Sequence, residues 1–303
     1  MKNKFWIGLA STFLSLSVVI LIALVFFGDY IDSIDEYFNA VTASETVAFT
    51  DADVEPEIET AVTTTTVTTT QPITETTTRP KSKPSYYGSD DKLVAFTFDD
   101  GPSPAVTPQI LDILERCGGK ATFFVLGNMA VGKENIFQRM LSLGCQIGNH
   151  SFAHARYKNM GEEEIRADFE KSQAEIKRVC GIEPELFRVP YGDNNSVISS
   201  AIDAPIVFWS IDTLDWSKKD KSGVNRSEEE RNAAIRSIYD GVINHVEPGD
   251  IVLMHDLYQI TVDAFDEIAT ALTEDGWKLV TVEEMFVSRG YELTPGVAHR
   301  CAK

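Results

Sequence analysis

The sequence predicts an α/β fold, an incomplete or distorted (β/α) barrel of about seven parallel strands. From about Lys92 onward, apolar runs of strand length alternate with longer amphipathic stretches, which is the order that parallel strands joined by helices produce. Short polar clusters directly follow several of these runs, and a barrel gathers its functional side chains at the carboxyl ends of its strands. No glycine-rich nucleotide fingerprint accompanies the runs, which disfavours a doubly wound sheet.

The apolar runs define the predicted strands. In chain order these are Leu93–Phe98, Ala121–Leu126, Cys145–Gly148, the weaker Leu186–Phe187, Ile206–Ser210, Ile251–Met254 and Lys278–Val282. Helices are predicted between them at Pro104–Cys117, Ile136–Leu143, Glu162–Val179, Glu228–Val246 and Thr261–Thr273. The third helix is the clearest, because Ile165, Phe169 and Ile176 recur at helical spacing on one face.

The N-terminal region is predicted to be a membrane anchor. Residues 5–28 carry no charged side chain, and a run of that length can cross a bilayer as a helix. Lys2 and Lys4 precede the run and acidic residues follow it, so residues 1–4 are expected in the cytoplasm and the rest of the chain outside. We therefore expect a single-pass protein of the cell membrane. The alternative is a signal peptide that is cleaved before secretion, although such peptides have a shorter apolar core of about 7–15 residues.

The segment from residue 29 to residue 88 is predicted to be a disordered linker. Its first half is acidic, and its second half is rich in threonine, with seven threonines among residues 63–70. Such a composition buries too little apolar surface to order the chain. Residues 89–303 are then left as the single globular domain.

Net charge and cysteine content limit the possible partners and cross-links. The chain carries a net charge of −19, which disfavours nucleic-acid binding through a basic face. Four cysteines allow two disulfide bonds in three pairings, and four free thiols are equally compatible with the sequence.

Two clusters supply the ligands for a metal site. Asp99 and Asp100 end the first predicted strand, and His150 and His154 directly follow the third. Two histidines four residues apart project from the same face of one helical turn, and either aspartate can complete a set of two histidines and one carboxylate around a divalent ion. Each cluster alone could be an ordinary turn or an exposed helix. Their joint position after strands favours a metal-dependent hydrolase instead.

The clusters, taken in order, resemble the motifs of the polysaccharide deacetylase family of the NodB-homology type. The resemblance covers roughly residues 90–290, and five motifs match: Thr97–Pro102, His150-Ser151-x-x-His154, Arg188-x-Pro190-Tyr191, Asp215-Trp216 and Leu253-x-His255. It implies that Asp99 is the general base and that Arg188 holds it in place. It also implies a single divalent metal ion with three ligands: Asp100, His150 and His154.

The remaining roles also come from the resemblance. His255 would be the general acid, oriented by Asp215, and Tyr191 would offer its backbone N–H to the oxyanion. The implied substrate-binding residues are Pro190, Tyr191, Trp216 and Leu253.

The resemblance implies a hydrolase that removes N-acetyl groups from a glycosamine polymer, with cell-wall peptidoglycan N-acetylglucosamine as the expected substrate and acetate as the product. Zinc is the expected ion, with cobalt or another divalent ion as alternatives. A chitooligosaccharide deacetylase, or an O-acetyl esterase acting on xylan or another acetylated polysaccharide, would use the same residues. Asp100 argues against the family branch that acts on muramic acid, which tends to lack this carboxylate. A non-catalytic glycan-binding module would be expected to have lost Asp99 or His255.

Overall fold

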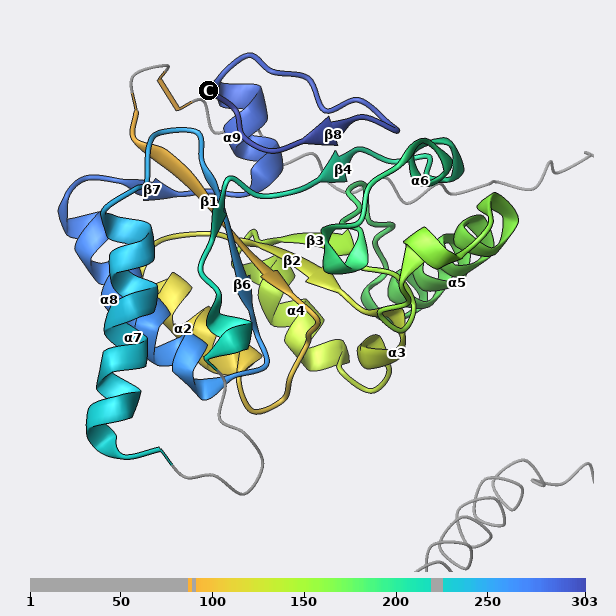
Figure 1. The fold of residues 1–303 in the computed structure, drawn as a ribbon. Coiled ribbons are helices and arrows are strands. Elements are labelled where there is room, and N and C mark those ends of the chain that lie inside the picture. Colours follow the sequence, from red (N-terminus) through yellow and green to blue (C-terminus); the bar gives the residue numbers. More distant parts are fainter. Residues whose placement is uncertain (1–86, 89–90, 219–225) are drawn as a thin grey trace, which may run out of the picture. The chain divides into compact units, whose positions relative to one another are not determined.

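Parallel strands form the centre of the fold in the computed structural model, which describes residues 87–88, 91–218 and 226–303 (Figure 1). The main sheet has the strand order β3-β2-β1-β6-β5, and β7 pairs with the first residues of β1. Its strands are β1 (Leu93–Asp99), β2 (Thr122–Val125), β3 (Gln146–Asn149), β5 (Ile211–Asp212), β6 (Ile251–His255) and β7 (Lys278–Leu279). All of these pairings are parallel.

The sheet continues beyond β3 through single bridges and a second pair of strands. Phe187 bridges to Asn149 of β3 on one side and to Ile206 of β4 (Ile206–Val207) on the other. Strand β4 then pairs in parallel with β8 (Ala298–His299). The predicted α/β class and the parallel, barrel-like arrangement of strands are thus confirmed, with Leu186–Phe187 reduced to a bridge.

Strand β1 shows why polar residues gather at one end of the sheet. All seven of its residues are buried, as expected for a strand covered on both faces. Val94, Phe96 and Phe98 face one apolar core, where Phe96 and Phe98 both contact the Phe265 ring at 5.1 Å between ring centroids. The alternate side chains face the other side, where the series changes from apolar at the start of the strand to Thr97 and Asp99 at its carboxyl end.

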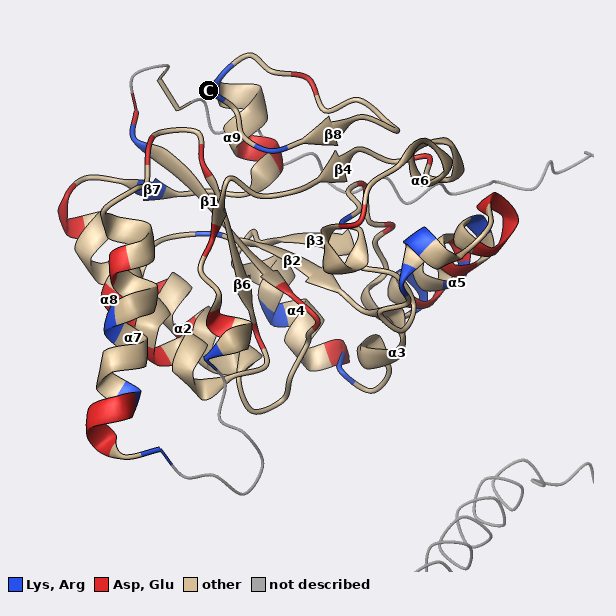
Figure 2. Cartoon of the chain, in the orientation of Figure 1, with Lys and Arg blue, Asp and Glu red and all other residues tan. Residues whose placement is uncertain are grey.

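Helices cover the sheet between successive strands. They are α2 (Thr107–Cys117), α3 (Gly127–Ala130), α4 (Glu134–Ser142), α5 (Glu162–Cys180), α6 (Ser196–Ala201), α7 (Glu228–Ile243), α8 (Gln259–Glu274) and α9 (Val282–Ser288). Helix α8 packs between α2 and α7. Acidic residues occupy the first turns of α5 and α7, where they complement the positive end of the helix dipole (Figure 2).

The structure also corrects and extends the predicted elements. The five predicted helices are present with boundaries shifted by up to three residues, and three short helices, α3, α6 and α9, were not predicted. The predicted strand Ile206–Ser210 ends at Val207, and β5 begins four residues later at Ile211. All four cysteines are free thiols.

The predicted membrane anchor lies outside the described part of the chain. The predicted segments 1–4 and 5–28, and the linker as far as residue 86, belong to residues that the structure does not describe. Among the residues it does describe, no helix is both long enough and apolar enough to cross a bilayer.

Candidate active site

A buried ion pair links β1 to the loop that follows Phe187. Arg188 is completely buried, and its Nη1 donates hydrogen bonds to Asp99 Oδ1 at 2.8 Å and to Thr97 Oγ1 at 2.7 Å. Its other donors reach the carbonyl oxygens of Val207 and Phe208 at 3.0 Å. Burial raises the pKa of Asp99 above its usual value, and Arg188 opposes that rise.

The three predicted metal ligands meet beside this pair. Asp100 Oδ1 lies 3.5 Å from His150 Nε2 and 3.4 Å from His154 Nε2, and the three ligand atoms are all within 4.8 Å of one another. The side chains come from two loops, because Asp100 follows β1 and both histidines follow β3. The parallel pairing of β1 with β2 and of β2 with β3 brings these two strand ends together.

The polar atoms of this cluster fit a divalent cation. His150 Nδ1 lies 2.8 Å from the Arg188 carbonyl oxygen, which can only accept, so the ring carries its proton on Nδ1 and turns the Nε2 lone pair toward Asp100. Burial lowers the pKa of His150 to about 3, which keeps the ring neutral. Asp100 Oδ1 is buried and accepts no hydrogen bond from the described residues. A lone pair facing an unpaired carboxylate oxygen is an arrangement that a bound cation satisfies.

The histidine pair does not lie on a helix, so that prediction was wrong. Residues 150–156 form a loop in which Ser151 and His154 have the left-handed φ values of 73° and 58°. Helix α5 fixes this loop from the side: Asp168 accepts the Phe152 N–H at 3.0 Å, and the Ser172 hydroxyl donates to the Ser151 carbonyl at 2.8 Å. The conformation of this loop, and not a turn of helix, brings both Nε2 atoms close to Asp100.

His255 and Asp215 form a second buried pair. His255 ends β6, and it is the ladder partner of Asp99 on β1. Its Nδ1 lies 2.8 Å from Asp215 Oδ1, while Asp215 Oδ2 accepts the His255 backbone N–H at 2.8 Å and the Thr261 hydroxyl at 2.7 Å. Burial disfavours the imidazolium, but the hydrogen bond and charge of Asp215 outweigh it and raise the pKa of His255 to about 9. The pair therefore holds a proton at neutral pH.

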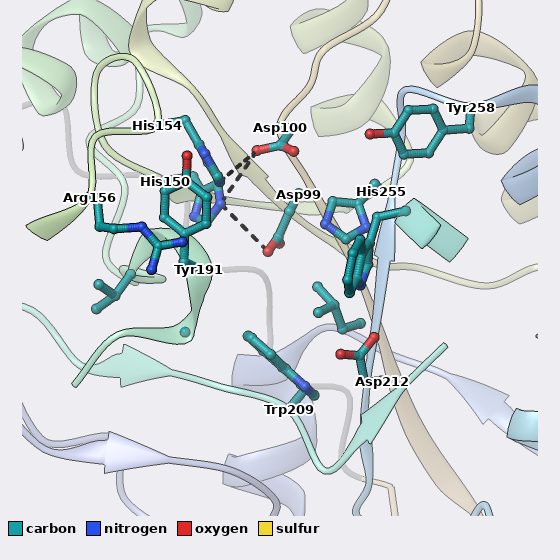
Figure 3. Close-up of a pocket in the computed structure, with 14 residues that line it drawn as sticks. Asp99, Asp100, His150, His154, Arg156, Tyr191, Trp209, Asp212, His255 and Tyr258 are labelled. Carbon is teal, nitrogen blue, oxygen red and sulfur yellow. Dashed lines mark ion pairs between the residues drawn. The ribbon is translucent and has the colours of Figure 1, made fainter. Parts of the chain in front are cut away.

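One cavity of about 410 Å³ is lined by Asp99, Asp100, His150, His154 and His255 (Figure 3). In Figure 3 the histidine pair lies on one side of Asp99 and Asp100, and His255 lies on the other side. Leu253 and Trp216 line the cavity, together with Tyr191, which has a left-handed φ of 62° and whose ring centroid lies 4.4 Å from that of His154 with the two rings tilted by 59°. Pro190, the residue before Tyr191, is buried.

The model of the family "Polysaccharide deacetylase" matches residues 87–207. A peptidoglycan-N-acetylglucosamine deacetylase of Bacillus cereus is 33% identical over 205 residues, which cover 65% of this chain and 89% of that protein. The chain belongs to the polysaccharide deacetylase family.

Two further relatives show the range of the family. The peptidoglycan-N-acetylmuramic acid deacetylase PdaC of Bacillus subtilis is 36% identical over 196 residues, covering 65% of this chain and 39% of that protein. The chain thus matches only about two fifths of the length of that relative. A family 4 acetyl xylan esterase from Clostridium thermocellum, solved in complex with a cobalt ion, superposes with a TM-score of 0.62 at 30% identity, covering 69% of this chain and 98% of that one.

Among the residues that line the cavity, the sequence assigned no role to Arg156, Trp209, Asp212 and Tyr258. Asp212 ends β5, and Trp209 follows the end of β4 by two residues; the predicted strand Ile206–Ser210 placed Trp209 inside a strand and so hid its position at a strand end. Arg156 lies with its guanidinium 3.8 Å from the Tyr191 ring centre. Arg156 and Tyr258 belong to loops whose sequences carry no periodic signal.

Proposed function

We propose that the chain is a metal-dependent hydrolase that removes N-acetyl groups from cell-wall peptidoglycan N-acetylglucosamine and releases acetate. One observation carries the proposal. A carboxylate that can accept a proton, Asp99, and an imidazolium that can donate one, His255, are ladder partners at the end of the sheet and share a cavity with a cluster suited to a cation. Metal-assisted hydrolysis of an amide uses all three parts.

The residues that would hold the ion are Asp100, His150 and His154. When bound there, a divalent ion supplies Lewis acidity, which activates water and polarises the acetyl carbonyl. We propose zinc for this position, with cobalt as the alternative that the Clostridium thermocellum esterase structure supports. The mixed nitrogen and oxygen ligand set suits either ion.

Asp99 is assigned the role of general base. Arg188 occupies Asp99 Oδ1, which leaves Oδ2 to accept a proton from the attacking water. The charge of Arg188 also favours the ionised carboxylate that this role requires. The Tyr191 backbone N–H is assigned to the developing oxyanion, and Leu253 and Trp216 form the walls that receive the acetyl methyl group.

His255 is assigned the role of general acid. Its Nδ1–H is committed to Asp215, so Nε2 carries the proton that can be given to the departing amine. An amine leaves poorly unless it is protonated, and the raised pKa of His255 keeps the donor charged at neutral pH. Ester hydrolysis needs this proton less, because an alkoxide is easier to expel than an amide anion.

The test uses the purified full-length chain loaded with zinc or cobalt. It is incubated with peptidoglycan, chitooligosaccharides and acetylxylan, and both acetate and new free amines are measured. Free amines from peptidoglycan support the proposal, and mass spectrometry of the released muropeptides shows whether glucosamine or muramic acid lost its acetyl group. Acetate from acetylxylan alone would replace the proposal with the O-acetyl esterase, for which the Clostridium thermocellum neighbour is the supporting observation.

We also propose that residues 5–28 hold the protein in the cell membrane, with the catalytic domain outside the cell. The uncharged run and the preceding lysines support this topology. The full chain should remain with the membrane fraction after a high-salt wash and be digested by protease added outside intact cells. A mature secreted protein that begins after residue 28 would contradict the anchor.

A further inference from the structure

Asp256 is a buried acid that none of the proposed steps uses. It directly follows His255 at the end of β6 and is 1% exposed. Its Oδ2 accepts a hydrogen bond from the Thr107 hydroxyl at 2.5 Å, and the Thr107 oxygen accepts the Ser103 backbone N–H at 2.7 Å. The Asp256 backbone N–H in turn lies 3.4 Å from the Asp99 carbonyl oxygen. Asp256 therefore reaches both ends of the loop between β1 and α2.

The carboxylate of Asp256 also lies directly against Gly101 in the middle of that loop. A Cβ atom placed on Gly101 would stand 2.1 Å from Asp256 Oδ2 and 2.2 Å from Oδ1, far inside any real contact. Gly101 does not have a left-handed φ, so its backbone conformation does not demand glycine. The position demands glycine because the Asp256 side chain occupies the space that a side chain would need.

We propose that Asp256 is a positioning residue. It holds the loop that follows β1, and with it Asp99 and Asp100, in the position needed for catalysis. The carboxylate contacts the loop at Gly101 from one side, and the Thr107 hydrogen bond fixes the carboxylate from the other. Two groups just before Gly101 depend on this arrangement: the base Asp99 and the metal ligand Asp100. The inference rests on the proposed function, because the assigned roles of those two aspartates define what must be positioned.

A purely structural role for Asp256 makes different predictions. Loss of a buried side chain that only fills space would lower thermal stability and leave the turnover of the folded enzyme intact. A positioning residue instead changes kcat, because misplacing a catalytic group by about 1 Å can cost on the order of 100-fold in rate. It also changes metal affinity, since Asp100 would no longer meet the two histidines at the present distances.

The experiment is a double-mutant cycle on the full-length chain with Gly101→Ala and Asp256→Ala. For each protein we would measure kcat and KM for acetate release, the Kd for cobalt by spectroscopic titration, and Tm. Gly101→Ala should lower kcat by about 100-fold, and Asp256→Ala by about 10-fold, with KM nearly unchanged. The double variant should be about 10-fold more active than Gly101→Ala, because the new methyl group then enters the space that the carboxylate has left.

Two further variants serve as controls. Asp256→Asn keeps the acceptor for Thr107, and burial already raises the pKa of Asp256 to about 7, so the amide should retain nearly full kcat. Gly241→Ala places a methyl group on α7 where no atom lies within 4 Å, so kcat and cobalt affinity should not change. If Asp256→Ala does not fold, Thr107→Val removes the same link from its other end and should lower kcat and cobalt affinity with little change in KM.

Two results would overturn the inference: full kcat and cobalt affinity in folded Asp256→Ala or Thr107→Val, or a double variant no more active than Gly101→Ala. Failure of the proposed function gives a different result. A wild-type protein that releases no acetate from any of the three substrates would refute the activity, while the cobalt affinities across the same cycle would still decide whether Asp256 positions the loop.

Discussion

The two halves of the active site differ in whether the chain itself supplies hydrogen-bond or ion-pair partners for their polar atoms. We call Asp99, Arg188, Asp215 and His255 the paired half, because each forms a buried ion pair with another member. We call Asp100, His150 and His154 the open half, because Asp100 Oδ1 is buried without a hydrogen-bond partner among the described residues. The paired half is preorganised by folding alone, whereas the open half is completed only by a ligand. The fold therefore builds the proton-transfer groups and leaves the cation to be recruited.

The largest difference between the halves should appear when the metal is removed. Chelation should abolish acetate release, and zinc or cobalt should restore it, while circular dichroism shows a folded protein throughout. Metal at 100 times its Kd should stabilise the protein by about 2.7 kcal/mol. His154→Ala should lose most of this gain, whereas His245→Ala, which alters an exposed histidine just beyond the C-terminal end of α7, should keep it. Full activity in a metal-free sample would refute the open half as a metal site.

Within the paired half, Asp99→Asn should have the largest effect. The amide cannot accept the proton from water, so kcat should fall by about 10²–10⁴-fold at every pH. Metal should still bind, because Asp100 and the two histidines are unchanged. Asp212→Asn is the matched control, since Asp212 lines the same cavity without contacting Arg188, and its kcat should change little. Loss of metal from Asp99→Asn would mean that the two aspartates exchange roles.

Arg188→Gln should test whether the paired half is also important for stability. The change removes a fully buried cation and leaves Asp99 without its partner, so the free energy of unfolding should fall by about 3–5 kcal/mol. The exposed pair of Arg166 and Glu162 offers a comparison, because Arg166→Gln should cost only about 0–1 kcal/mol. Urea denaturation of both variants measures the difference. Equal losses would show that the burial of Arg188 does not matter energetically.

The same contrast explains which parts of the site the sequence could predict. Members of both halves stand at strand ends, and alternation of apolar residues locates strand ends well, as with Asp99 after Phe98. The path of the histidine loop was not predictable, because it depends on Asp168 and Ser172, which reach it from α5. The close approach of Asp256 to Gly101 likewise depends on a tertiary contact between residues far apart in sequence. Local pattern places residues at the right end of the sheet, and packing decides how they face one another.

The smallest predicted effect is a shift in pH dependence that belongs to the paired half alone. The rate should be bell-shaped, because Asp99 must be ionised and His255 protonated. The alkaline limb should lie near pH 9, the pKa to which Asp215 raises His255. In Asp215→Asn the burial of the ring, which lowers the pKa of His255, is opposed only by the charges of Asp99 and Asp100, so the alkaline limb should shift to lower pH.

The free energy of unfolding should also depend on the protonation of His255. A folded-state pKa above the unfolded value means that His255 stabilises the protein fully below about pH 6.5 and loses this contribution as pH rises through about 9. The difference in unfolding free energy between wild type and Asp215→Asn should therefore be largest near pH 6 and shrink toward pH 9.5. Metal affinity near pH 6 should be the same in both proteins, because the hydrogen-bond partners of Asp215 among the described residues are His255, Thr261 and Trp216, and none of them is a proposed metal ligand. An alkaline limb that does not move in Asp215→Asn would show that Asp215 does not set the pKa of His255. The pairing would then have no role in proton transfer.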